Sequence, residues 1–559
     1  MHMSVRSPTC VRFVQPPLTY IKLKARWFAT AQTTQCVQPM IAALDSTSCA
    51  NIKMSEIRGI DSQQRVAYAR RIVAVCTPVA VGALLGCTTI APAVRTETEL
   101  VLPQSWSDSQ SIDGSARTAS SLAQWWTRFN DPLLVRLIDE ALSANTSVVS
   151  AMAALAQSRA IAEVQAAALL PALRGSASAQ RSRSGLSGGN NANAFKAGFD
   201  ASWEPDVFGG QRAAVSAADA DTQASIASLG NIQVSIAAEV AVNYLQLRGL
   251  QARLAIAVAN LDSQEETLQI TQWRTQAGLA TSLDIEQARA ATAQTRAQIP
   301  TLRTSAQQAE HSLAVLTWRT PAALHDRLSA AAADAITAAM PSDDLVLAFP
   351  AETLRQRPDV RASEARVTAA SLRVRQADAA RYPSFQLGGS LGLSALTLGA
   401  LTHGSSVIAA LLGSVSAPIF DGGAAQAQVR AQRAVFQQAA AAYDAAILAA
   451  LKDVEDSLIS LRNDRDRLQS LRIAADAAQN ASMLANQRYS SGLIDFQVVL
   501  ETQRTALNTQ DSVASTVADI NADHVRLYKA LGGGWEATNL FAGAPAAAVT
   551  AQPNKASSQ

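Results

Sequence analysis

The sequence predicts a mixed, mainly α fold with an internal duplication. In this fold, long coiled-coil helices form an α-helical barrel that continues into a transmembrane β-barrel contributed by several chains. Three observations lead to this fold class. Matched motifs recur at a fixed separation, helical segments run far beyond the length of an ordinary domain helix, and four segments show the residue alternation of membrane strands.

The duplication is visible in pairs of matching residues. Arg488 follows Arg274 by 214 positions, and Gly492 follows Gly278 by the same 214 positions. An acidic residue and a second arginine upstream, and a leucine after each glycine, match as well. A constant separation between several motifs indicates two copies of one structural unit. We assign the first repeat to residues 131–318 and the second to residues 359–531.

The longest helices are expected in the middle of each repeat. Residues 211–276 contain no proline, and at ~1.5 Å per residue they predict a rod of roughly 100 Å. Apolar residues recur at steps of four and three, which is the spacing of coiled-coil packing. After a Gly-Leu turn, a return helix is expected over residues 282–299, where Pro300 ends it before it resumes. The second repeat should return over residues 495–531.

A shorter helix is expected at the start of the first repeat. Asp131 followed by Pro132 is a helix start signal, with an N-cap acceptor and a first-turn proline. The Ala-rich stretch that follows predicts one continuous helix to Leu170, which Pro171 breaks.

Each repeat also contains a segment that reads as a β-hairpin, over residues 172–205 and 384–418. Apolar and polar residues alternate in these segments, although only partially over residues 407–418, and aromatic residues flank the apolar face. About ten alternating residues match a strand that crosses a bilayer at a tilt. The first hairpin alone fits a half-buried sheet of a soluble protein equally well. Its recurrence in the second repeat favours the membrane.

Four strands cannot close a barrel, since the smallest outer-membrane barrels need about eight. An open sheet edge in lipid leaves backbone groups unpaired, at a cost of several kcal/mol each. Several chains must therefore pool their strands.

Composition excludes other functional classes. The net charge of the 559 residues is only +2, so nothing indicates a nucleic-acid partner. All five cysteines lie in the first 87 residues, and the histidines are isolated from one another. We therefore expect no metal site, no cofactor and no catalytic residues, and the chain is not predicted to be an enzyme.

The segment before Cys87 resembles an export signal. Arg70-Arg71 precede an apolar run that is shorter than the about 20 residues of a transmembrane helix. The run ends in Leu84-Leu85-Gly86-Cys87, which resembles the lipobox of bacterial lipoproteins, where the cysteine becomes the lipid-bearing first residue. The alternative is a buried hydrophobic helix with an incidental cysteine. Thr88 instead of Asp after the cysteine favours delivery to the outer membrane.

Residues 1–86 are accordingly expected to be absent from the mature protein. Met54 is an alternative start, so the first 53 residues read as a start-site artefact. Residues 87–130 should form a lipidated, irregular lead-in. Residues 319–358 should form an equatorial belt between the repeats, and residues 532–559 a C-terminal belt with a disordered tail.

The motifs together resemble the TolC/OprM family of outer-membrane efflux ducts, and in particular the NodT-like lipoproteins that serve resistance-nodulation-division (RND) pumps. Besides the lipobox, the matching motifs are Trp125-Trp126, Asp131-Pro132, Trp203 to Gly210, Glu239 to Arg248, Ala277-Gly278-Leu279, Arg357 to Arg361, Pro418 to Gly423 and Leu527 to Trp535. They occur in the family's order and cover nearly all of residues 87–540.

The resemblance implies a homotrimer with a twelve-stranded barrel in the outer membrane and a helical tube that crosses the periplasm. It also implies a periplasmic adaptor (membrane fusion) protein and an inner-membrane RND pump as partners, and passive export of drugs or other small toxic compounds. The family uses the hairpin tips for docking the adaptor. The corresponding residues here are Arg274, Gly278, Leu279, Thr281, Arg488, Gly492 and Leu493.

Acidic residues just past the two turns are candidates for a gate at the entrance of the duct. Asp284, Asp495 and Glu501 are these candidates, and Glu286 lies beside them. A ring of carboxylates would favour cations. Alternatively, these residues are helix N-terminal charges stabilised by the helix dipole, or solvated side chains. Ile494 stands where some family members have an arginine that locks the closed entrance, so a salt-bridge lock is in doubt.

Two rival functions remain open. A duct for type I protein secretion would share the fold but couple to an ATP-driven exporter. A soluble periplasmic coiled-coil scaffold would have no channel and no conductance in planar bilayers. The lipobox favours the duct of a pump.

Overall fold

The computed structural model describes residue 106 and residues 122–183, 191–330 and 355–535. All of them belong to one structural unit, Val94–Gln559. Cys87, most of the expected lead-in, part of the equatorial belt and the C-terminal tail lie outside the described residues.

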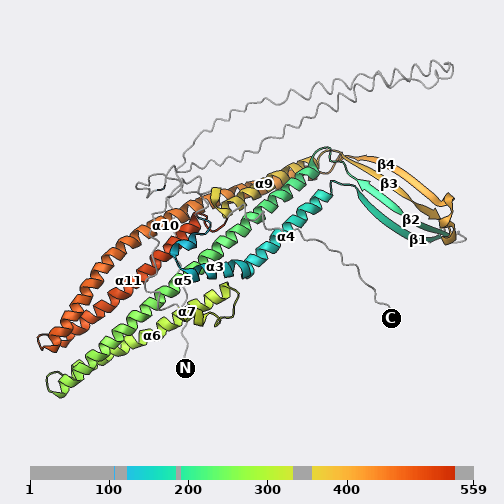
Figure 1. Cartoon of the computed structure of the whole chain (residues 1–559). Helices are drawn as coiled ribbons and strands as arrows, with labels where there is room; N and C mark the ends of the chain where they lie inside the picture. Colours follow the sequence, from blue (N-terminus) through green and yellow to red (C-terminus); the bar gives the residue numbers. More distant parts are fainter. Residues whose placement is uncertain (1–105, 107–121, 184–190, 331–354, 536–559) are drawn as a thin grey trace, which may run out of the picture. The chain divides into compact units, whose positions relative to one another are not determined.

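The two long hairpins of the chain have equal dimensions (Figure 1). A helix of 67 residues is followed by a turn and a helix of 35 residues in both repeats. These helices are α5 (Gly210–Gln276), α6 (Ser282–Leu316), α10 (Ala424–Ser490) and α11 (Phe496–Ala530). Every boundary in the second hairpin is 214 positions after its counterpart. The duplication predicted from the sequence is therefore present in the backbone.

The shorter helices that precede the strands are also duplicated. Helices α4 (Thr146–Ala167) and α9 (Pro358–Ala379) both have 22 residues, and their starts are 212 positions apart. The separation therefore changes from 212 to 214 between the first strand of each β-hairpin and the long helix.

The strands form one antiparallel sheet in the order β1-β2-β3-β4. They are β1 (Ala172–Arg183), β2 (Asn191–Trp203), β3 (Ser384–Ala395) and β4 (Val407–Ser416). The β-hairpin of one repeat joins that of the other through β2 and β3, with Ser202 opposite Gly388. The outer edges of β1 and β4 have no partner strand among the described residues.

Apolar side chains of the sheet point away from any core. On one face of the sheet, Leu411 is 87% exposed, Val415 is 65% exposed, and Leu391, which pairs with Ala409, is 59% exposed. Burying such side chains is worth about 1.5–3 kcal/mol each, so water is an unfavourable environment for this face. This apolar face of the sheet is suited to contact with lipid or with another chain.

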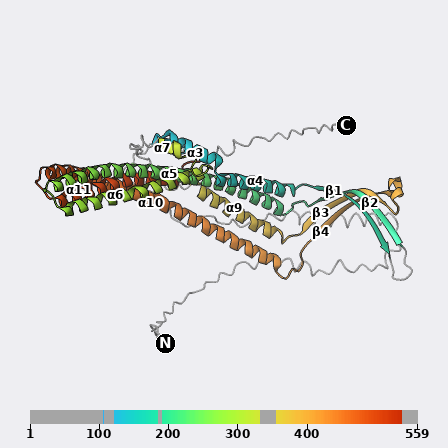
Figure 2. The same ribbon diagram turned by 90° about the horizontal axis from the view of Figure 1, so that it is seen from below.

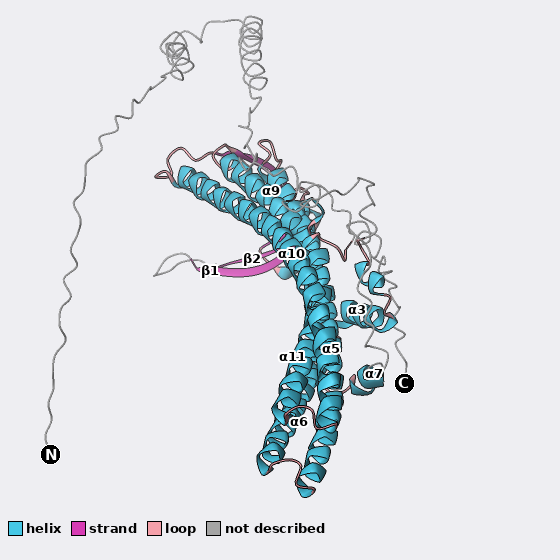
Figure 3. Cartoon of the chain, turned by 90° about the vertical axis from the view of Figure 1, so that its left-hand side faces the viewer, coloured by secondary structure: helices cyan, strands magenta, loops and turns pink. Residues whose placement is uncertain are grey.

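The sheet and the hairpin tips lie at opposite ends of the long helices (Figures 1 and 2). Helix α5 packs against α4 and α9 near the sheet and against α6 and α11 towards its tip. Figure 3 shows α5 and α11 running side by side to that end. The two repeats thus lie next to each other along most of their length.

The largest aromatic core sits near the middle of the helices. Trp125, in the short helix η3 (Trp125–Phe129), stacks on Tyr528 with ring centroids 5.3 Å apart and planes at 15°. The amide of Gly534 donates to the carbonyl of Leu122 at 3.0 Å. Trp106 is 3% exposed in a neighbouring cluster that contains Leu531.

A buried polar network joins the start of the first repeat to its long helix. Asp131 accepts the amide of Leu133 at 2.8 Å and the hydroxyl of Tyr244. Arg248 donates to Tyr244 Oη at 2.8 Å. Burial raises the pKa of Tyr244, so it stays a neutral donor. The N-cap predicted at Asp131 is confirmed.

The predicted single helix from Pro132 to Leu170 is wrong, because the chain breaks at Asn145. Helix α3 (Pro132–Ala144) ends there and α4 begins. The Asn145 side chain accepts the amide of Ser147 at 2.8 Å and donates to the carbonyl of Leu316 at 2.9 Å. A tertiary contact with α6 therefore stabilises a break that the Ala-rich sequence does not indicate.

The predicted end of the return helix at Pro300 is also wrong. Helix α6 continues through Pro300. Its neighbour Ile299 is buried with Ala257 and Leu261 of α5. Packing on both sides of the proline outweighs the single backbone hydrogen bond that proline removes. Of the expected belt, the structure describes the short helix α7 (His325–Ala330).

Candidate functional site: the hairpin tips and the strand-to-helix junction

The two hairpin tips have the same backbone geometry. Gly278 and Gly492 follow the long helices with φ of 75° and 74°. The amide of Leu279 donates to the carbonyl of Arg274 at 2.7 Å, and that of Leu493 to Arg488 at 2.9 Å. This six-to-one bond is the Schellman motif, in which glycine takes the left-handed position without a steric cost.

The tips differ in how the return helix begins. In the first tip, the Thr281 hydroxyl accepts the Asp284 amide at 3.3 Å, while Asp284 accepts the Thr281 amide at 2.8 Å. This is a capping box. In the second tip, Asp495 stands at the N-cap without a side-chain hydrogen bond to the helix.

Arg274 joins the first tip to the second. Its guanidinium donates to the carbonyl of Tyr489 and, at 3.3 Å, to that of Ser490, which are the last carbonyls of α10. It also lies 4.5 Å from the centre of the Tyr489 ring. The partial negative charge at a helix C-terminus and the electron-rich face of an aromatic ring both stabilise a cation. Tyr489 is buried at 5% exposure.

The equivalent arginine of the second tip has different surroundings. Arg488 is exposed to solvent in the single chain. A Cβ added to Gly492 would lie 3.7 Å from Arg274 Nη2, whereas one added to Gly278 would meet nothing within 4 Å. The position that Arg274 occupies beside the second tip is therefore open beside the first tip.

The other acidic candidates have arginine partners on their own helices. Glu286 accepts from Arg289 at 2.7 Å, and Glu501 accepts from Arg504 at 2.6 Å. Both pairs are exposed and three residues apart. Such surface pairs contribute less than about 1 kcal/mol. They leave the carboxylates available to solvent.

Large apolar side chains project from both tips. Leu279 is 69% exposed and Leu493 is 74% exposed. Trp273 adds a third, 59% exposed, at the end of α5. Exposed apolar groups clustered at one end of a protein indicate a contact surface. Sequence reasoning missed Trp273 and the Arg274–Tyr489 contact, although Tyr489 directly follows Arg488 in the motif used to find the repeats.

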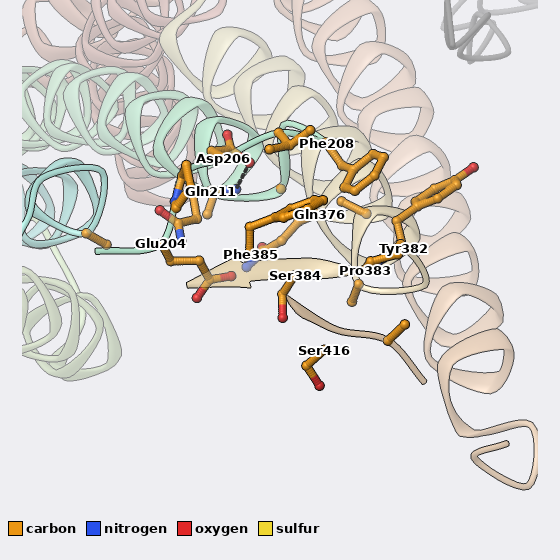
Figure 4. A pocket seen from close by; sticks show the side chains of 18 of the residues that line it. Glu204, Asp206, Phe208, Gln211, Gln376, Tyr382, Pro383, Ser384, Phe385 and Ser416 are labelled. Atoms are coloured by element: carbon orange, nitrogen blue, oxygen red, sulfur yellow. Dashed lines mark hydrogen bonds between the residues drawn. The ribbon is translucent and has the colours of Figure 1, made fainter. Parts of the chain in front are cut away.

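A second candidate site is a cavity of about 620 Å³ where the strands meet the helices (Figure 4). The Phe208 ring stacks on Tyr382 with centroids 5.0 Å apart. Asp206 accepts the amide of Arg212 at 2.9 Å and its side-chain Nε at 3.0 Å. Burial alone would raise the pKa of Asp206, but these hydrogen bonds lower it overall. The cavity thus adjoins the start of α5.

Within the described ranges, no three His, Cys, Asp or Glu side chains are grouped so that they could hold a metal ion. Two described helices, α5 and α10, are long and apolar enough to cross a membrane by length and composition alone. The most apolar window of α5 is 56% buried, but that of α10 is only 11% buried. The buried share shows that α5 is a packed core helix, while α10 has an uncovered apolar face.

A four-stranded sheet with exposed apolar faces, joined to two equal helical hairpins, defines a subunit of an outer-membrane channel. The comparison with protein families agrees. The chain belongs to the outer membrane efflux protein family, whose model matches residues 137–317 and 349–533. The resemblance inferred from the sequence motifs is confirmed.

Curated relatives carry the same assignment. The pyoverdine export outer membrane protein OpmQ of Pseudomonas aeruginosa is 33% identical over 469 residues, which are 81% of this chain and 95% of OpmQ. The toluene efflux pump outer membrane protein TtgF of Pseudomonas putida is 29% identical over 426 residues, 75% of this chain and 87% of TtgF. Nodulation protein T of Rhizobium leguminosarum bv. viciae is 27% identical over 456 residues, 81% of this chain and 92% of the relative.

Solved structures confirm the predicted fold class. The outer-membrane channel OprN superimposes with a TM-score of 0.68 at 30% identity, covering 78% of this chain and 99% of OprN. The open state of the Neisseria gonorrhoeae MtrE channel gives a TM-score of 0.69 at 26% identity, covering 78% and 96%. The protein is an efflux channel of the outer membrane that extends into the periplasm.

Proposed function

We propose that three copies of the chain form the exit duct of a tripartite RND-type efflux pump. Drugs or other small toxic compounds would pass through it by diffusion, driven by the pump below, and the chain itself would perform no chemistry. The observation that carries this proposal is a sheet whose two edges have no partner strand among the described residues, directly continuous with two hairpins of equal length.

The open edges require further copies. Strands β1 and β4 would each present a row of unpaired amides and carbonyls to lipid, at several kcal/mol for each group. Pairing β4 of one copy with β1 of the next removes every edge when the ring closes. Three chains of four strands give twelve strands, which lies within the range of outer-membrane barrels.

The hairpin tips fit a docking role for an adaptor protein. Trp273, Leu279 and Leu493 are exposed there, and Arg488 adds a positive charge beside them. Aromatic and arginine side chains are the usual anchors of protein interfaces. The toluene pump relative carries the name of a pump component, which supports an adaptor and an inner-membrane pump as partners. No feature of the described residues favours the rival function, a type I secretion duct.

The predicted lipid anchor is compatible with chain length. Trp106 packs near the middle of the helices, and Cys87 precedes it by 19 positions. Nineteen residues span up to about 60 Å when extended. The part of α5 from Val234, beside Gly534, to Gly210 is about 36 Å long. The stretch between Cys87 and Trp106 is therefore long enough to permit a lipid anchor at the membrane end of the helices.

We also keep Asp284, Asp495 and Glu501 as candidates for the entrance of the duct. Asp284 has a local structural role in its capping box. Asp495 makes no such bond. Its charge can therefore be removed without the loss of a capping hydrogen bond. Asp495→Asn should lower cation preference in a planar bilayer, whereas Asp284→Asn should mainly weaken the turn.

The decisive experiment is purification from outer membranes followed by conductance measurement in planar bilayers. We expect a stable trimer with a β-signal, and loss of resistance to toxic compounds in a deletion strain only when the paired pump is present. A stable monomer without β-structure, or the same susceptibility with and without the pump, would contradict the proposal.

A further inference from the structure

The register of the sheet shows which strand residues share a face. Residues directly opposite each other on paired strands point to the same side of a sheet, and successive residues alternate between the sides. One row across the four strands consists of Leu173, Ala201, Gly389 and Leu411, and the next row consists of Arg174, Asp200, Ser390 and Ala410. The first row belongs to the apolar face of the sheet. The second row belongs to the polar face, which carries charges and hydroxyl groups.

The polar face is the one that a barrel built from this sheet turns inward, since outer-membrane barrels present apolar residues to lipid and polar residues to the lumen. The backbones of β2 and β3 also approach closely on this side. A Cβ added to Gly198 would lie 2.7 Å from the Cα of Gly392, and one added to Gly392 would lie 2.9 Å from the Cα of Gly198. Glycines mark such close approaches and bends in barrel strands. Strands converge on the inner side of a curved sheet, so the curvature agrees with the polarity.

Strand β4 departs from the polarity of this inner face. The residues that β1 places there are all polar, namely Arg174, Ser176, Ser178, Gln180 and Ser182. Those of β4 begin with three apolar positions, Ile408, Ala410 and Leu412, which we call the β4 stripe. Ile408 is 49% exposed and Leu412 is 65% exposed. The described residues therefore leave an apolar stripe uncovered on a polar face.

Glycines lie next to the two large side chains of the β4 stripe. Ile408 is opposite Gly392, and Leu412 is opposite Gly388. Neither glycine has a side chain that could cover its neighbour, and Gly392 is itself opposite Gly198 on β2. Ile408 and Leu412 thus project beside a strip of bare backbone.

The charged residues of the polar face lie on other strands. Arg174 is opposite Asp200, and Lys196 is opposite Ser178, so the charges are on β1 and β2. The residues that β3 places on this face are uncharged. Because β3 separates β2 from β4, these charges lie about 10 Å from the stripe. A compound at the β4 stripe therefore does not have to displace water from a charged group.

The position of the β4 stripe restricts what can occupy it. Lipid contacts the opposite face of the same strand, where Leu411 and Val415 are exposed. A second copy would pair with β4 along its hydrogen-bonding edge, beside the stripe and not over it. Water is an unfavourable neighbour for exposed leucine and isoleucine. The compounds that an efflux channel conducts are the remaining contents of its lumen, and a neutral apolar compound is the kind that gains from leaving water at this stripe.

We propose that the β4 stripe is a contact site for neutral, apolar small molecules inside the barrel, so that such compounds are part of the cargo. The inference rests on the proposed export duct and specifies a class of compound that the duct favours. Each copy supplies only two large apolar side chains, so the contact is weak. Weak contacts suit a channel, because conduction requires that a bound compound can leave again.

Single cysteines distinguish the two faces of β4, since no native cysteine follows Cys87. The test variant is Ala410→Cys, and the matched control is Ala409→Cys, an exposed alanine one residue away on the apolar face. In conducting channels reconstituted in bilayers, a hydrophilic thiol reagent should label Ala410→Cys and leave Ala409→Cys at the background of the unsubstituted protein. Labelling of Ala409→Cys but not of Ala410→Cys would place the stripe against lipid. That result would overturn the inference while the duct stands.

The apolar preference is measured with two neutral reagents, N-phenylmaleimide and N-(2-hydroxyethyl)maleimide, because charges in the lumen do not attract them. The ratio of their labelling rates at Ala410→Cys is compared with the ratio at Ser178→Cys, on the same face but on β1. Ile408 and Leu412 lie about 7 Å on either side of position 410. We expect the ratio of the phenyl to the hydroxyethyl reagent to be roughly three- to tenfold higher at Ala410→Cys, as a small apolar contact would give.

Replacing the large side chains of the stripe then tests whether they cause the preference. Ile408→Ser with Leu412→Ser in the Ala410→Cys channel should lower the ratio to that of Ser178→Cys. Leu411→Ser, the control on the apolar face, should leave it unchanged. Equal ratios at the two cysteines, or a ratio that ignores the double substitution, would overturn the inference in a channel that still conducts. Absence of conductance in the unsubstituted protein would contradict the proposed duct, and the inference with it.

Discussion

The first and second helical hairpins have the same lengths but very different surroundings. Helices of 67 and 35 residues occur in both, yet the apolar window of α5 is 56% buried and that of α10 only 11%. Duplication has therefore preserved the backbone, whereas side chains have diverged. Equivalent side chains differ most at positions where the first hairpin packs against the other repeat and the second hairpin is exposed.

Two pairs of equivalent positions illustrate the divergence. Contacts between the repeats use charges and close approach, as in Arg373 with Asp221 and the α5–α11 contact at Gly249. Their counterparts on the free faces are apolar, as at Ile161, or bulkier, as at Asn463 in place of Gly249. Two residues of one chain are held at a high effective concentration. This offsets the entropy cost of ordering long charged side chains in an ion pair.

The largest loss of folding stability is expected when a buried residue of the first repeat is replaced by its counterpart from the second repeat. Tyr244→Leu introduces the residue that stands at the equivalent position 458. Asp131 and Arg248 would lose their shared hydroxyl in a buried site, which should cost about 2–3 kcal/mol. Thermal denaturation of the assembled protein measures this. Leu458→Met, a volume-conserving control, should cost less than about 1.5 kcal/mol, and equal losses for both would contradict the comparison.

The next effect is expected at the closest approach of α5 and α11. A Cβ at Gly249 would lie only 2.5 Å from Ala518 Cβ. Gly249→Val should therefore push the helices apart and lower stability by about 1–3 kcal/mol. Asn463→Val, at the equivalent free position, should change stability by less than about 0.5 kcal/mol in the dissociated chain. Denaturation in detergent compares the two, and a tolerated Gly249→Val would show that the α5–α11 contact is loose.

A smaller effect is expected from Arg274→Ala. It removes the bonds to the end of α10 and the contact with the Tyr489 ring, at about 1–2 kcal/mol. Separation of the tips should raise conductance in planar bilayers, while the strands stay intact by circular dichroism. Arg274→Lys keeps the charge but not the planar contact and should rescue only partly. Unchanged conductance would show that this contact does not hold the tips together.

The smallest effect is expected from acid. His524, 3% exposed, has a pKa lowered to about 4 by burial and by Arg465. The unfolded chain binds the proton first, so stability should fall as pH drops from about 6.5 towards 4, by about 1 kcal/mol at pH 5.5. Burial raises the pKa of the adjacent Asp523, which has the opposite effect at lower pH. His524→Gln should flatten the loss between pH 7 and 5.5, and an unchanged slope would assign it to other groups.

Much of the fold was predictable because local signals and tertiary packing agree. The Asp131 cap, the Gly278 and Gly492 turns and the lengths of α5 and α10 follow from backbone preferences that the structure does not override. The break at Asn145 and the continuous helix through Pro300 were not predictable. In both places, a contact with a helix distant in sequence decides the local conformation.

The candidate site was predictable only in part for a related reason. The turn residues at the tips are visible in the sequence, because glycine at a left-handed position has few substitutes. The contact of Arg274 with Tyr489 joins residues 215 positions apart, and the periodicity of one helix carries no information about it. The duplication shows which residues are equivalent but not which of them touch within a chain.

The equal lengths of α5 and α10 have a consequence for any ring built from this chain. A single inserted residue would shift a tip by about 1.5 Å along its helix and rotate its face by a quarter-turn or more. Because both turns follow helices of 67 residues, the tips of a ring whose long helices begin at one level would all end in one plane. The lower rim of such a ring would be level in height, but its side chains would alternate between those of the first and those of the second hairpin tip. A docking partner would therefore contact two chemically different tips at one depth.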